Sequence, residues 1–244
     1  NTYFGSYREV FARDLYESIR DLPIVSPHGH IQPELLADPN ARFRDPADLF
    51  AASVLVDAQL LGFGDIDGAR KTLQALPLQT TESATIALLA ARVESWARDF
   101  AAARILVEQA TAGSVMFGED YSRGLALAPI LQALGDTGAA HAAYAQARAE
   151  LQARIPTGPD DALLHAALAR ALSGLGEHAE ATRIAEAAAA MPTQSVLDQE
   201  QARLSLAEVR MRAGRADDAV DGLRGLMRAS AGGLLSVHAL RLDP

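Results

Sequence analysis

Residues 128–147, APILQALGDTGAAHAAYAQA, hold the feature that decides the fold. An apolar stretch with helical spacing ends at Gly135, and an alanine-rich stretch begins after Asp136. Glycine ends helices because it adopts the left-handed backbone conformation at little cost. An aspartate at the start of the next helix accepts hydrogen bonds from free N–H groups. The stretch therefore predicts two helices joined by a tight turn.

The same pattern of Gly, four residues and Ala recurs from about residue 51 onward. Its instances are Gly64 to Ala69, Gly135 to Ala140, Gly176 to Ala181 and Gly214 to Ala219, with Ala97 to Ala102 as a variant that lacks the Gly. The intervals between them are 33, 38, 41 and 38 residues. Because periods of this length are typical of stacked helical hairpins, we predict an all-α fold.

Polar residues next to the turns complete the predicted hairpins. Acidic side chains follow the turns, where we expect them to cap the second helices: Asp65, Asp99, Asp136 and Glu177. We also expect Asp160 or Asp161 to cap a first helix. Pro129 falls inside a predicted first helix, so that helix either starts later than the repeat pattern indicates or kinks.

The repeated positions resemble the tetratricopeptide (TPR) repeat. Ala128, Gly135, Ala140, Tyr144 and Ala147 match that family's small, turn, small, aromatic and small positions. Residues 169–188 match well, and residues 207–226 match with a larger last residue. The resemblance implies a right-handed α-solenoid of about five TPR-like hairpins over residues 51–244. The last repeat further resembles arrays appended to bacterial signalling proteins.

The resemblance also implies a binding surface on the concave side of the solenoid, lined by first-helix residues. Helical phase gives the candidate groove residues Glu94, His165, Arg170, Arg203 and Arg210. We expect a protein or peptide partner there. The formal net charge of -9 argues against nucleic acid, since phosphate binding requires clustered Lys and Arg.

The first fifty residues break the repeat pattern. They predict an amphipathic helix, a short buried strand ending in PHGH, and a proline-punctuated loop. The stretch from Leu15 to Phe50 resembles the N-terminus of uronate isomerase, of the amidohydrolase superfamily. Residues 1–50 are therefore expected to be an incomplete TIM-barrel fragment, because a full barrel needs eight strands.

In that family the matching HxH motif binds a divalent metal, usually zinc, and the enzyme interconverts hexuronic acids with their keto forms. The motif falls on His28 and His30, which point to the same side of a strand. Because catalytic zinc takes three protein ligands, the pair alone is incomplete. The two interpretations are an orphaned motif without metal, and a zinc site completed by another chain or by nearby carboxylates.

Composition limits the remaining possibilities. The chain has no cysteine and no long apolar run, so we expect no thiolate site and no membrane span, and a cytoplasmic location. We predict a non-catalytic scaffold without cofactor that binds a protein or peptide. The alternative is a fragment of, or a fusion with, a metal-dependent uronate isomerase. Sequence leaves open the oligomeric state, and whether the two segments are a fusion, a truncation or a composite.

Overall fold

The computed structural model describes residues 56, 58–75, 84–110, 122–155, 161–193 and 195–228. The chain divides into two units, Asn1–Leu49 and Phe50–Pro244. All of the first unit lies outside the described residues, and with it the expected N-terminal helix, strand and barrel fragment. The described elements therefore all belong to the second unit.

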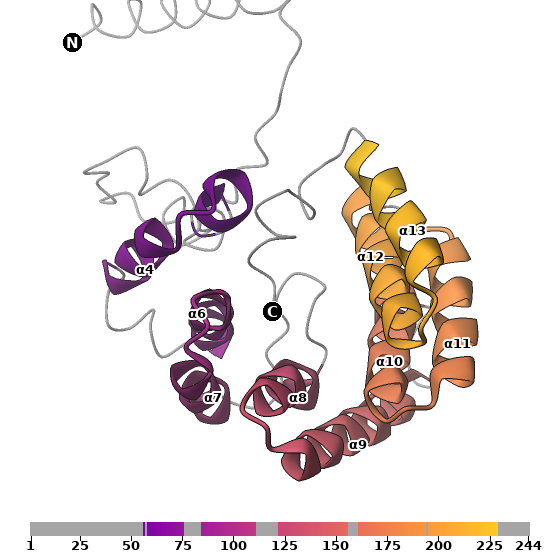
Figure 1. Ribbon diagram of the computed structural model, residues 1–244, viewed down its shortest axis with the longest axis horizontal. Helices are drawn as coiled ribbons and strands as arrows, with labels where there is room; N and C mark the ends of the chain where they lie inside the picture. The colour runs from indigo at the N-terminus through magenta and orange to yellow at the C-terminus, as the bar shows by residue number, and fades with distance from the viewer. Residues whose placement is uncertain are drawn as a thin grey trace, which may run out of the picture. The chain divides into compact units, whose positions relative to one another are not determined.

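Every regular element among the described residues is a helix, as the repeat pattern predicts (Figure 1). The elements pair in chain order into five hairpins: η2 (Ala58–Phe63, a π-helix) with α4 (Ile66–Gln74), α6 (Ala84–Trp96) with α7 (Phe100–Gln109), α8 (Arg123–Ala133) with α9 (Thr137–Arg154), α10 (Ala162–Gly174) with α11 (His178–Ala190), and α12 (Val196–Arg212) with α13 (Ala216–Arg228). The all-α prediction is thus confirmed for this part of the chain.

Four of the hairpins use one turn geometry. In the α8–α9 turn, Gly135 has φ 81° and the N–H of Asp136 donates to the carbonyl of Leu131 at 2.9 Å. The same six-residue bond closes the turns at 98, 176 and 214. This Schellman arrangement satisfies helix carbonyls that would otherwise lack a donor.

Arg98, not Ala97, occupies the turn position of the second hairpin. Its φ of 63° makes it the one non-glycine residue with positive φ among those described. The prediction placed the variant turn at Ala97, one residue too early. With Arg98 as the turn residue, Ala103 becomes the small residue five positions later, and Ala103 is fully buried whereas Ala102 is not.

Three of the predicted caps are confirmed. Asp65, Asp99 and Asp136 accept hydrogen bonds of 2.8–3.0 Å from the backbone N–H three residues later. Glu177 makes no such bond, so this prediction was wrong. Its longer side chain instead accepts a hydrogen bond from Arg148 at 2.8 Å. Among first helices, Asp161 caps α10 through Leu163 and Leu164, as one of the two predicted alternatives.

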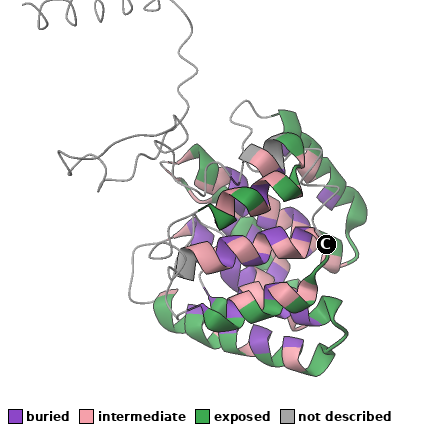
Figure 2. Cartoon of the chain, turned by 90° about the vertical axis from the view of Figure 1, so that its left-hand side faces the viewer, coloured by how far each residue is buried: buried purple, intermediate pink, exposed green. Residues whose placement is uncertain are grey.

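Alanine at the fifth position after each turn brings the two helices of a hairpin together. All five of these alanines are buried: Ala69, Ala103, Ala140, Ala181 and Ala219. Figure 2 shows the resulting pattern, in which buried stripes line the sides of the helices that face their neighbours. Since each helix buries only one stripe, its stability depends on adjacent helices.

The buried residues of this unit form two main clusters that meet at α8. One joins η2, α4, α6 and α7, and receives Ile130 from α8. The other joins α8 to α12 and receives Leu125 and Leu131 from α8. A third, small cluster consists of Ala166, Ala188 and Ala202.

Pro129 lies within α8, which begins at Arg123 behind the N-cap Ser122. The predicted alternative in which the helix starts after the proline is therefore wrong. Because proline has no N–H, it cannot donate to the carbonyl of Leu125.

Candidate binding surface on the first helices

The first helices of the last three hairpins pack side by side. Helix α10 contacts both α8 and α12, whereas each second helix packs mainly on first helices. Corresponding positions on these helices, counted back from the turn, include Pro129, Arg170 and Glu208 at six residues and Gln132 and Ser173 at three. Residues three apart share a helix face, so these positions form one continuous surface. We call it the first-helix face.

A chain of polar contacts runs along this face through three hairpins. The Tyr144 hydroxyl donates to Gln132 Oε1 at 3.1 Å and accepts from Arg212 Nη1 at 2.9 Å. Arg212 Nη2 also lies 3.3 Å from Glu208 Oε1. Glu208 Oε2 in turn accepts from Arg170 Nε at 2.8 Å. These five residues, the polar chain, connect α8, α9, α10 and α12.

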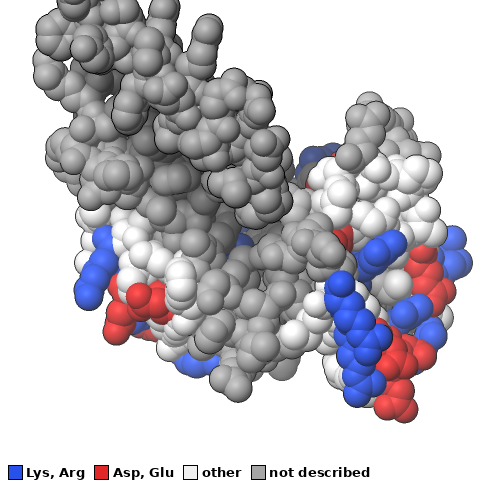
Figure 3. Space-filling view, turned by 90° about the horizontal axis from the view of Figure 1, so that it is seen from above, with Lys and Arg blue, Asp and Glu red and all other residues white. Residues whose placement is uncertain are grey.

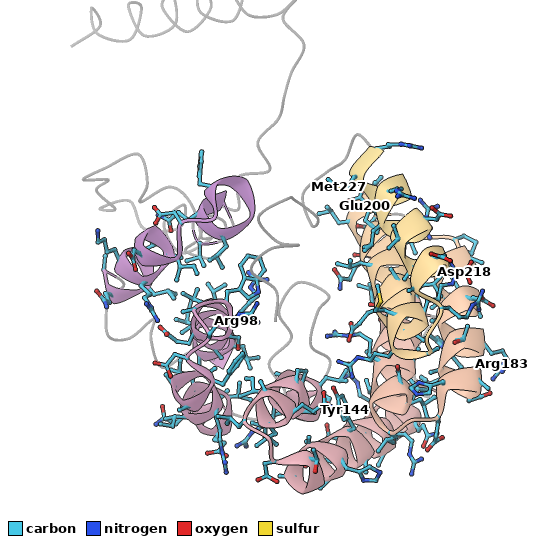
Figure 4. All side chains as sticks on the ribbon, in the orientation of Figure 1. Arg98, Tyr144, Arg183, Glu200, Asp218 and Met227 are labelled. Atoms are coloured by element: carbon cyan, nitrogen blue, oxygen red, sulfur yellow. The ribbon has the colours of Figure 1, made fainter. Side chains whose placement is uncertain are left out.

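Tyr144 is the centre of the polar chain because Gly174 leaves room for its ring. A Cβ added at Gly174 would lie 2.5 Å from three ring atoms of Tyr144. The Arg212 guanidinium carbon lies 5.7 Å from the ring centroid, within cation–π range. The ring is therefore held between α10 and α12, and Figure 4 shows its place between the hairpins. The family resemblance marks position 144 as aromatic, but the contact with Arg212 had no signal in the sequence.

Helix α12 carries a further stripe along one side. It consists of Leu197, Gln201, Leu204, Glu208 and Met211, spaced by four, three, four and three residues. Leu197 and Met211 are exposed by 47% and 46% of their surface, and Leu204 is half-buried but belongs to no described core cluster. The opposite side of the helix packs through Ala202 and Val209. We call this set the α12 stripe.

Two buried polar residues flank the stripe. Glu200 and Gln201 are only 5% and 7% exposed. Within the part of the chain that the structure describes, neither Glu200 Oε1 nor Gln201 Oε1 receives a hydrogen bond. Buried acceptors without donors are uncommon in native proteins and call for an explanation. Sequence analysis named neither residue; the spacing of seven between Leu197, Leu204 and Met211 was the available signal for the stripe.

The predicted groove residues lie in several environments. Glu94 of α6 accepts hydrogen bonds from Arg70 of α4, which raise the pKa of the Arg70 guanidinium. Arg210 of α12 pairs with Glu186 of α11 at 3.0 Å, and so points toward a second helix. Arg170 belongs to the polar chain, whereas His165 is half-buried on α10 and Arg203 is exposed on α12. Among these five, the structure brings none into direct contact with another, and the groove itself stays a prediction.

Surface charges are mixed. Basic and acidic side chains lie next to each other on the face seen in Figure 3, with pairs within helices such as Arg183 with Glu180 at 2.6 Å. The Arg183 hydrogen bond lowers the pKa of Glu180. Such exposed pairs contribute little to stability.

The predicted metal ligands His28 and His30 lie outside the described residues. The part of the chain that the structure describes contains no group of three or more side chains able to hold a metal ion together. Within the same part, no helix is long and apolar enough to cross a membrane.

Comparison with known proteins gives two separate similarities. No protein-family model matches the chain. A segment is 54% identical over 39 residues to uronate isomerase of Nostoc punctiforme, covering 16% of this chain and 8% of that protein. Uronate isomerase of Mesorhizobium japonicum is 46% identical over 74 residues, covering 26% of this chain and 16% of its own length. The chain thus spans a sixth or less of these two relatives.

Among solved structures, the chain is similar to a Podosopora anserina protein described as a kinesin light chain with nearly identical TPR-like repeats. The sequence identity is 19%, the TM-score is 0.40, and the match covers 80% of this chain and all of the other. The five hairpins are defined by contacts within this chain, independently of that similarity.

Proposed function

We propose that the chain is a non-catalytic helical-repeat scaffold that binds a protein or peptide across the first helices α8, α10 and α12. The observation that carries this proposal is the polar chain, which links these helices on one side. A surface fixed in advance loses less conformational entropy on binding. The proposal includes a right-handed solenoid with the first helices on its concave side, a cytoplasmic location and no cofactor.

Panning a phage-displayed library of random peptides over the full chain tests this function. Hydrogen exchange with an enriched peptide bound should show new protection in α8, α10 and α12. The second helices α9, α11 and α13 serve as the internal control, because they carry similar exposed charge. Failure to enrich any peptide, or protection confined to the second helices, would refute the proposal.

The matches to uronate isomerase favour a second candidate, in which the chain is a fragment of, or a fusion with, that metal-dependent enzyme. Zinc would be held by His28 and His30, with ligands from another chain or from carboxylates completing the site. A coupled uronate-isomerisation assay with added zinc tests this candidate. Turnover that disappears in His28→Ala would favour it over the scaffold.

A further inference from the structure

We propose that the α12 stripe binds an amphipathic helix of the partner, and that this helix carries a basic side chain between two of its apolar residues. The inference rests on the proposed scaffold function and adds the site and the chemistry of its ligand.

The spacing of the stripe argues for a helical ligand. Leu197, Leu204 and Met211 recur every seven residues, which is nearly two helical turns. An apolar seam of this spacing is what a second helix packs against in helix-in-groove recognition. The seam spans 14 residues, or about 21 Å at 1.5 Å per residue, so it matches about four turns of a partner helix.

The flanking acceptors argue for a basic side chain on that helix. Glu200 follows Leu197 by three residues, Gln201 follows it by four, and Leu204 comes next on the same face. A ligand lying along the leucines would therefore reach Glu200 on one side and Gln201 on the other. Both residues are more than nine-tenths buried and offer an acceptor oxygen that no described group satisfies.

A carboxylate accepts hydrogen bonds but donates none, so the ligand must supply the donor. A Lys or Arg would also neutralise the buried charge and form a charge-assisted bond. An acidic ligand would add repulsion to a chain whose net charge is already -9. Figure 4 shows Glu200 near the end of the last hairpin where Met227 of α13 also lies, so a further apolar side chain adjoins the site.

The test uses the full chain and a phage-displayed library of random 16-residue peptides. We expect enriched peptides to combine apolar residues at spacings of three and four with Lys or Arg between them. Fluorescence anisotropy with one such synthetic peptide then measures Kd for variants. Leu197→Ser and Glu200→Gln should each weaken binding by about tenfold, which corresponds to about 1.4 kcal/mol.

Two matched variants serve as controls. Val220→Ser changes an exposed apolar residue on α13, and Glu180→Gln neutralises an exposed carboxylate on α11. Both should leave Kd within about twofold of the wild type, a change under about 0.5 kcal/mol. Circular dichroism checks that each variant folds.

The outcomes separate the two proposals. Enriched peptides without basic residues, or binding insensitive to both Leu197→Ser and Glu200→Gln, would overturn the inference and leave the scaffold function standing. A library that yields no binder at all would overturn both.

Discussion

Arg98 stands in a backbone conformation that the other four hairpins give to glycine. Its φ of 63° lies in the left-handed region, which costs a residue with a Cβ about 1–2 kcal/mol. The side chain is exposed, so no buried contact offsets this cost. Figure 4 shows the residue at the end of α6.

Replacing Arg98 by glycine should therefore stabilise the protein by about 1 kcal/mol. Thermal or urea unfolding of Arg98→Gly measures the change. Gly135→Ala is the matched control, because its Cβ would meet nothing within 4 Å and φ there is 81°. That variant should lose about 1 kcal/mol. A loss of stability in Arg98→Gly would contradict the argument.

Gly174 serves a different purpose, since its lack of a side chain admits the ring of Tyr144. We expect Gly174→Ala to destabilise the protein by about 1–3 kcal/mol, because overpacking outweighs the gain in helix propensity. Gly138→Ala, also in a helix but with open space around the added Cβ, should instead stabilise by about 0.5–1 kcal/mol. Urea unfolding of both variants measures the contrast; equal effects would mean that the Tyr144 contact is unimportant.

These residues show what the sequence could and could not predict. Turn glycines and the alanines five positions later follow from local physics, so the hairpins were predictable. The register at Arg98 was missed because a non-glycine left-handed residue carries no composition signal, although Asp99 marked the cap. The direction of Arg210 toward Glu186, and the burial of Glu200, depend on how hairpins stack, which no single repeat encodes.

At the scale of elements, α8 is the helix that both main core clusters share. It gives Ile130 to one cluster and Leu131 to the other, although these residues are neighbours in sequence. Successive residues lie about 100° apart around a helix, so α8 presents a buried side to each cluster. Pro129 is only half-buried and lies between these two sides, on the first-helix face.

Pro129→Ala should therefore stabilise α8, by up to about 3 kcal/mol, since it restores a helix donor without removing a buried side chain. The change is measured as a shift in Tm. Pro192→Ala, at an exposed position outside the helices, is the control and should lower stability by less than about 1 kcal/mol. A lower Tm for Pro129→Ala would show that the helix geometry imposed by the proline is needed for packing.

For the Phe50–Pro244 unit as a whole, two clusters joined through one helix predict unequal coupling between hairpins. In a repeat array each hairpin is stabilised by its neighbours, so a local loss of packing spreads only as far as strong interfaces carry it. Between the second and third hairpins, the main contact is α7 with α8. The break between the clusters therefore falls at this interface.

Leu89→Ala tests this division. Leu89 is fully buried in the cluster of the first two hairpins, so its truncation should cost about 2–5 kcal/mol. We expect hydrogen exchange to accelerate in α4, α6 and α7 while α10 to α13 keep their protection. Leu168→Ala, buried in the other cluster, should give the reverse pattern. Uniform acceleration across all helices in both variants would instead mean that the unit unfolds as one cooperative body, and that α8 transmits packing strain fully between its two sides.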